Sequence, residues 1–201
     1  MKRSRKLIFA LLVASLVLAM SVPAFAASKK KKALRAYNAY MAGLPSSYEF
    51  DVVYITKDSV PELMVRRSYS SKSLFTFKNG RMSEIELTMP YYVSGYYKKR
   101  GVIVNFFAHG GYSPLRYTEY YKISSGKMVP KLRYEKAGQL NFSTDKYSWN
   151  QVYSKFRANG QAVSIKKAKY KSLLKKMVGS RKKLTFKYKA NTAANRAKYL
   201  G

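Results

Sequence analysis

Apolar and polar residues alternate along much of the chain beyond residue 50, which is typical of strands that bury one face. Between residues 82 and 87, Ile85 and Leu87 fall on one face of such a strand, while Glu84 and Glu86 fall on the other. Runs of this kind are rich in Val, Ile, Tyr and Phe. We expect strands at Phe50–Ile55, Leu63–Arg67, Leu74–Lys78, Met82–Met89, Val102–Phe107, Arg116–Ile123, Met128–Tyr134, Val152–Phe156 and Leu184–Tyr188.

Short turns separate several of these runs. Asn79-Gly80, Ser125-Gly126 and Asn159-Gly160 each lie between two alternating apolar segments. Gly and Asn tolerate the positive φ that tight hairpin turns need. Strands joined this closely pair antiparallel, because a parallel pair needs a crossover of a dozen or more residues. The pattern therefore predicts an antiparallel β-meander of hairpins.

Helical spacing replaces the alternation near both ends of the chain. Residues 29–41 and 165–178 each place apolar side chains on one side of a helix, and we expect Ser28 and Ser164 to cap them. A short terminal helix is expected after Thr192. The predicted fold class is α+β: an antiparallel β-meander of hairpins flanked by an N-terminal helix and a Lys-rich helix near the C-terminus.

The first 26 residues have the pattern of a secretory signal peptide. Basic residues at positions 2–6 precede the uncharged run Leu7–Met20, and Ala24-Phe25-Ala26 supplies the small residues that a signal peptidase needs. A retained anchor is the alternative, but the run is shorter than the ~20 apolar residues that span a bilayer. We therefore expect cleavage after Ala26, an extracellular or wall-associated location, and a single domain from 27 to 201, with no Pro-, Gly- or Ser-rich linker dividing it.

The charge is strongly positive, with 40 Lys and Arg against 9 Asp and Glu and a formal net charge of +31. Without the four basic residues of the leader the charge is +27. An exported cationic protein meets anionic wall polymers, anionic glycans, anionic lipids and extracellular nucleic acid. Because the cations are spread along the chain, solubility alone is the competing explanation. The chain has no Cys, which excludes disulfides and a lipid-modified cysteine.

Basic residues are interleaved with Tyr, or concentrated on the Lys-rich helix, in two regions that we take as candidate polyanion contacts. They are Lys98, Lys99, Arg100, Arg116, Lys166, Lys167, Lys171, Lys175 and Lys176. Tyr can stack on sugars or bases while cations hold phosphates. Tyr is also a favoured strand residue that covers half-exposed sheet faces. The helix can lie on an anionic membrane, or dock on the core with a solvated Lys face, which its cap, its stop and the following strand favour.

Signs of catalysis are weak. His109-Gly110-Gly111 is similar to the oxyanion loop of esterases, but the chain lacks a Gly-x-Ser-x-Gly elbow and a second His. A lone His beside two glycines is typical of a turn. A glycan hydrolase would need two carboxylates facing one cleft, which sequence does not reveal. We expect no cofactor.

Residues 54–63 resemble a calcium-loop segment, Asp-x-Asp/Asn-x-Asp-Gly-x-Pro-Glu-Leu, that is common in small exported proteins of clostridia-like bacteria. Asp58 and Glu62 match two of its acidic positions, but Tyr54 and Thr56 replace charged ligands and Lys57 places a cation among them. We expect a degenerate loop that makes a turn and binds no metal. The Lys-rich tail with Asn-Thr-Ala-Ala-Asn-Arg at residues 191–196 is also similar to that group. The group carries no established activity, so the resemblance implies location and architecture rather than chemistry.

The sequence thus predicts an exported, non-enzymatic protein that contacts anionic envelope or extracellular polymers electrostatically. The alternatives are a glycan hydrolase with a carboxylate pair and a membrane-active cationic protein.

Overall fold

A computed structural model describes residues 28–68 and 71–201. The predicted signal peptide, residues 1–26, lies outside these described residues. Within the described ranges, no helix combines the length and apolar character needed to cross a membrane.

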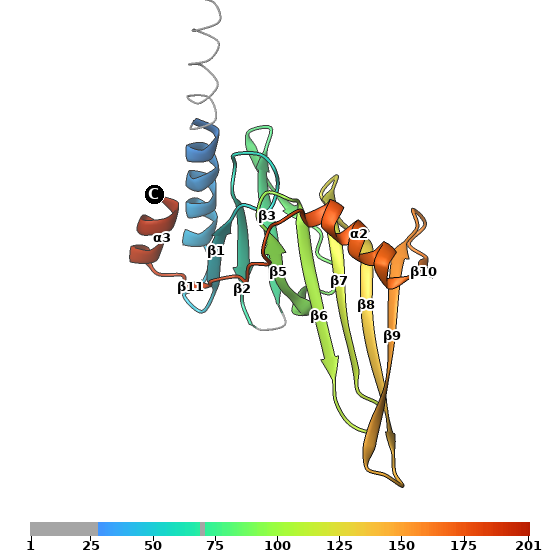
Figure 1. The fold of residues 1–201 in the computed structure, drawn as a ribbon. Coiled ribbons are helices and arrows are strands. Elements are labelled where there is room, and N and C mark those ends of the chain that lie inside the picture. The colour runs from blue at the N-terminus through green and yellow to red at the C-terminus, as the bar shows by residue number, and fades with distance from the viewer. Residues whose placement is uncertain (1–27, 69–70) are drawn as a thin grey trace, which may run out of the picture.

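The chain forms two antiparallel sheets, seen side by side in Figure 1. The short sheet has the order β11-β1-β2-β3-β4, and its outer side is covered by the N-terminal helix (residues 28–42) and by α3. Thr192 caps α3 as predicted, because its side chain accepts a hydrogen bond from the Asn195 amide. The bounds of these elements are β1 Glu49–Val53, β2 Glu62–Arg66, β3 Lys72–Lys78, β4 Arg81–Ile85, β11 Lys189–Ala190 and α3 Ala193–Leu200.

The long sheet has the order β10-β9-β8-β7-β6-β5 and carries α2 across one face. Strands β6 to β9 continue well past α2 and end in a protruding twisted hairpin (Figure 1). The bounds are η1 Pro90–Tyr92, β5 Val93–Tyr97, β6 Val102–His109, β7 Leu115–Ser124, β8 Lys127–Asn141, β9 Lys146–Phe156, β10 Ala162–Ser164 and α2 Lys167–Val178.

Side chains from both sheets share one buried cluster. Met64 and Leu74 from the short sheet pack with Ile103, Tyr121 and Met128 from the long sheet. All three predicted turns join adjacent antiparallel strands, at residues 79–80, 125–126 and 159–160. The predicted α+β class with its two flanking helices is confirmed, and the hairpins are distributed over two sheets.

The expected strand Leu184–Tyr188 is wrong, because only Leu184 pairs with a strand. Its amide and carbonyl exchange hydrogen bonds of 2.8 and 2.9 Å with Tyr96 in β5. Farther along, the Lys187 amide donates a hydrogen bond of 2.8 Å to the Asp51 carboxylate, so it does not pair with a neighbouring strand. The apolar residues of this segment serve packing instead, since Phe186 and Tyr188 lie against the shared cluster.

We predict that Gly95→Ala weakens this attachment. A Cβ at Gly95 would overlap the carbonyl oxygen of Leu184, which is backbone and cannot swing away. We expect a loss of about 2 kcal/mol in the free energy of unfolding, measured by urea denaturation. Gly43→Ala is the control, because a Cβ there meets its nearest atom at an ordinary 3.6 Å. Equal stability of the two variants would contradict the prediction.

Other boundaries also differ from expectation. Ser164 ends β10 instead of capping α2, because it pairs with Ser154 of β9, and the cap residue Lys166 makes no side-chain cap bond. Strand β4 stops at Ile85, and the next residue, Glu86, bridges to Lys127. Strand β5 was not expected, because Gly95 interrupts its apolar pattern.

Candidate functional site

Helix α2 docks on the long sheet through its apolar side. Tyr170 and Val178 are buried, and Leu174 and Met177 pack near Val102. The lysines of the helix are exposed, including the predicted Lys166, Lys167, Lys171, Lys175 and Lys176. The apolar side is therefore already occupied by the core, which argues against a helix lying on a membrane and agrees with a docked helix with a solvated Lys face.

The tyrosines under α2 keep this region free of negative charge. Burial raises the pKa of Tyr120 to about 12, and the nearby Tyr97 adds to the shift. Burial also raises the pKa values of Tyr170 and Tyr97. These hydroxyls remain neutral at physiological pH, so the cations above them face no phenolate.

The same face of the long sheet continues beyond α2, and we call it the α2 face. Side chains alternate between the two faces of a strand, and directly paired residues share a face. Tyr120 under α2 therefore shares its face with Arg116 and with Lys136, the strand partner of Arg116. Tyr134 and Tyr153 are paired on this face as well, with 5.1 Å between their ring centroids. The predicted contact Arg116 thus lies on the same side of the sheet as the α2 lysines.

All carboxylates of strands β6 to β9 lie on the opposite face. These strands contain two acidic residues, Glu119 and Glu135, which alternate with Tyr120 and Tyr134. Helix α2 contains no acidic residue. Among the described strands and helix that build it, the α2 face is therefore basic and aromatic without a compensating carboxylate.

The predicted turn Lys98-Lys99-Arg100 lies beside the end of α2. The Arg100 guanidinium lies directly against Gly179, the C-cap of the helix, and the Arg100 carbonyl accepts a hydrogen bond from the Lys122 ammonium. Burial lowers the pKa of Lys122, and the charges of Lys57, Arg100 and Lys131 lower it further. The three neighbouring cations show that positive charge is crowded at this end of the helix.

Several basic residues of this region were missed by the sequence reasoning. Lys136 is half-buried against Trp149, with its ammonium 4.1 Å from the ring centroid. Lys155 is exposed and shares the α2 face, because it pairs with Leu132 across from Tyr120. Arg181, Lys182 and Lys183 follow the helix and are exposed. Strand alternation would have found Lys136 and Lys155, if the register between β7, β8 and β9 had been known.

The carboxylates mostly form ion pairs. Five of the nine, Glu49, Asp51, Glu86, Glu119 and Glu135, lie within 4.0 Å of a Lys or Arg nitrogen. Glu119 and Glu135 share Arg133, but the Glu119 side chain is only 2 % exposed. Its oxygens accept hydrogen bonds from Arg133 and Tyr121. Glu119 therefore binds only partners inside the fold.

His109, the histidine of the predicted His-Gly-Gly turn, is exposed at the end of β6.

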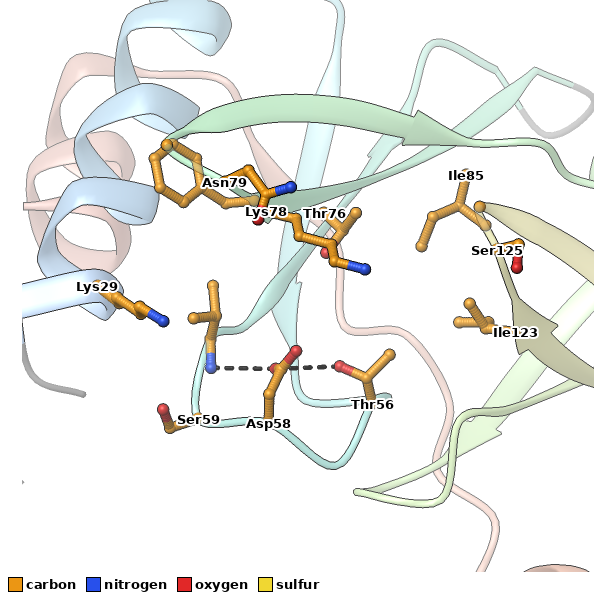
Figure 2. Close-up of a pocket in the computed structure, with 14 residues that line it drawn as sticks. Lys29, Thr56, Asp58, Ser59, Thr76, Lys78, Asn79, Ile85, Ile123 and Ser125 are labelled. Atoms are coloured by element: carbon orange, nitrogen blue, oxygen red, sulfur yellow. Dashed lines mark hydrogen bonds between the residues drawn. The ribbon is translucent and has the colours of Figure 1, made fainter. Parts of the chain in front are cut away.

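The degenerate loop forms the turn between β1 and β2 and lines a cavity of about 510 Å³ (Figure 2). Asp58 accepts hydrogen bonds from the Thr56 hydroxyl at 3.1 Å and the Val60 amide at 3.2 Å, so it stabilises its own loop. Lys29 and Lys78 extend toward the cavity from the N-terminal helix and β3, as Figure 2 shows. Over residues 28–68 and 71–201, no three His, Cys, Asp or Glu side chains are grouped to hold a metal ion.

Glu62, the second acidic residue of the loop, is buried rather than open to the cavity. It accepts hydrogen bonds from the Ile55 amide at 2.8 Å and the Thr56 amide at 3.3 Å. Burial raises the pKa of its carboxyl to about 7, although these bonds and one from the Thr56 hydroxyl oppose the shift. Its role is to hold the loop ends together.

Comparison with known proteins finds no matching family model, curated protein or solved structure.

Proposed function

We propose that this is an exported, non-enzymatic binding protein that holds an anionic polymer of the cell envelope on its α2 face. The observation that carries the proposal is the separation of charge on the long sheet. Lysines and arginines gather on one face with exposed aromatic rings, while both carboxylates of β6 to β9 lie on the other.

The shape of this face suits an extended polymer better than a small ligand. The α2 lysines stand on the outer side of the helix, and Arg116 and Lys136 follow along the strands beyond it. A row of cations along a surface binds a chain of anionic groups mainly by releasing its counterions. Tyrosines between the cations add stacking surface for sugar rings.

The hydrolase alternative has less support. Two pairs of acids share a partner. Glu119 and Glu135 meet at Arg133, where Glu119 is enclosed by its hydrogen-bond donors. Asp58 and Glu62 both accept from the Thr56 hydroxyl, where Glu62 is buried. A general acid or nucleophile must reach the glycosidic bond. The wall-binding function requires no such access.

The test is retention on immobilised heparin, a linear polyanion, at several salt concentrations. Lys167, Lys171 and Lys175 are replaced together by Gln, which keeps the length and helix propensity of the side chains. We expect affinity at physiological salt to fall about tenfold or more, and the slope of log affinity against log salt to fall by about 2 to 3.

A matched control removes the same charge elsewhere. Lys30, Lys31 and Lys32 are exposed on the N-terminal helix, which lies at the other end of the molecule in Figure 1. Their replacement by Gln should leave most of the retention intact. If both triple variants lose retention equally, binding depends on net charge alone and the proposal fails. In a separate experiment, soluble wall polymer and DNA compete with heparin for the protein, and the concentration of each that releases it ranks their affinities.

A further inference from the structure

The far end of the long sheet carries an exposed aromatic cluster, which we call the distal tip. Residues 141–150, which turn from β8 into β9, are all exposed. Four rings stand here, with exposed fractions of 70 % for Tyr112, 77 % for Phe142, 43 % for Tyr147 and 40 % for Trp149. Large apolar side chains gathered at the end of a protrusion indicate an interaction surface.

The rings are held in place by the strands and by each other. Tyr112 and Phe142 lie 5.4 Å apart between ring centroids, and Tyr147 and Trp149 lie 5.8 Å apart. The Tyr147 hydroxyl donates a hydrogen bond to the Gly111 carbonyl at 3.3 Å, which ties the hairpin to the neighbouring β6–β7 loop. The tip is thus an ordered element built from two adjacent loops.

Trp149 is positioned by a glycine. Its strand partner is Gly138, and a Cβ there would lie 2.9 Å from Trp149 Cζ3 and 2.9 Å from Pro114 Cγ. The ring therefore lies on bare backbone, with the Lys136 ammonium 4.1 Å from its centroid. Cations follow immediately behind the rings, with Lys136 and Arg116 on paired strands and Lys146 at the start of β9.

We propose that the distal tip inserts into the interface of an anionic lipid bilayer. Tyr and Trp favour the boundary between headgroups and hydrocarbon, and Phe enters more deeply. The cations behind the rings match the charge of anionic headgroups, and Asp145 is the one acidic residue in the segment 141–150. A convex, aromatic protrusion fits a soft surface, whereas a small molecule or a peptide needs a groove.

Insertion here is distinct from polymer binding at the α2 lysines, and Arg116 and Lys136, on the strands between α2 and the tip, belong to both surfaces. The tip lies at the opposite end of β8 and β9 from α2 (Figure 1), so a wall polymer on the α2 lysines leaves the rings free. The protein would bridge the outer surface of the membrane and the polymer beyond it.

The single Trp of the chain makes the test direct, because Trp149 lies in the tip. The full chain is mixed with vesicles of phosphatidylglycerol and phosphatidylcholine in equal parts, with and without brominated acyl chains. We expect a blue shift of the Trp149 emission and quenching by the bromines. Vesicles of phosphatidylcholine alone should bind at least tenfold more weakly.

The matched variant is Tyr112→Ser with Phe142→Ser, which keeps Trp149 and the same N-terminus, so any contribution of the leader is equal in both proteins. Both residues are highly exposed, so the fold should be unchanged by circular dichroism. We expect about a tenfold or greater loss of the vesicle affinity reported by Trp149, with unchanged retention on heparin.

Three results would overturn the proposal. The bromines could fail to quench Trp149 although the chain sediments with the vesicles, which would mean that another part of the chain binds the lipid. The emission shift could occur without lipid and grow with protein concentration, which would make the tip a contact between copies. Heparin alone could shift the emission as strongly as vesicles, which would place the tip within the polymer site. Loss of heparin retention in the α2 lysine variant, with vesicle insertion intact, would support both proposals separately.

Discussion

Replacing Arg133 with Met is expected to lower the free energy of unfolding by about 3 kcal/mol at neutral pH. Arg133 reaches Glu119 with two nitrogens, at 2.6 Å from Nε and 2.5 Å from Nη2. Glu119 has almost no contact with solvent, so the substitution leaves a buried charge without its cation. The cost of that unpaired charge exceeds what the ion pair itself contributes. Met keeps an unbranched apolar side chain but also removes the guanidinium that lies 5.3 Å from the Tyr117 ring centroid and 5.4 Å from that of Phe156.

The measurement is urea denaturation at constant pH, with a double variant as the critical comparison. Adding Glu119→Gln to Arg133→Met removes the orphaned charge and should restore much of the lost stability, because Tyr121 can still donate to the amide oxygen. Lys127→Met is the control. It breaks the Lys127–Glu86 pair, in which both side chains are at least 70 % exposed, and should cost less than about 1 kcal/mol. If the double variant is no more stable than Arg133→Met, the loss does not come from a buried charge.

The second large effect is a fall in stability as the pH rises through the neutral range. Burial raises the pKa of Glu62 to about 7 in the folded chain, against 4.5 for the ordinary carboxyl. The folded state therefore binds a proton more tightly than the unfolded state, and stability from this group is greatest at low pH. It declines as the pH passes from about 4.5 to 7. Between pH 5 and pH 8 the free energy of unfolding should fall by about 2.5 kcal/mol.

Glu62→Gln should flatten this pH dependence, because the amide does not titrate. Its oxygen can accept from the Ile55 amide and its nitrogen can face the Thr56 hydroxyl, so only the 3.3 Å bond from the Thr56 amide is lost. The variant should then be at least as stable as the parent at pH 8. Glu84→Gln is the control, since Glu84 is exposed and should leave the slope unchanged. A Glu62→Gln variant with the parent's slope would show that another group titrates.

Both effects concern acids that the fold has withdrawn from the surface. Glu62 and Glu119 are buried, and Asp51 is held by Lys189 at 2.5 Å and by the Lys187 amide. Pairing Glu119 with Arg133 and Asp51 with Lys189 inside the fold leaves these carboxylates unavailable to the exposed cations. Of these acids, Glu119 lies on the long sheet, on the face opposite the α2 lysines.

Much of the fold could be predicted from local pattern. Alternation located β1 to β3 and β6 to β9 to within a few residues, except that β8 and β9 extend well into the hairpin, and Gly residues with positive φ marked the turns at 80, 126 and 160. The Thr192 cap and the apolar side of α2 also followed from short-range rules. Export after Ala26 stays a prediction, because that segment lies outside the described residues.

The tertiary structure decided which side chains of these elements lie together and which are buried. The sequence by itself determined that the chain has hairpins, helices and a large excess of cations, because period, turn residues and charge are local properties. Only the pairing register decided that Arg116, Lys136 and the α2 lysines share one face, that Glu119 is enclosed, and that four aromatic rings meet at the tip. Which face a side chain occupies changes with a shift of one residue between strands, and that register is fixed by packing between residues distant in the chain.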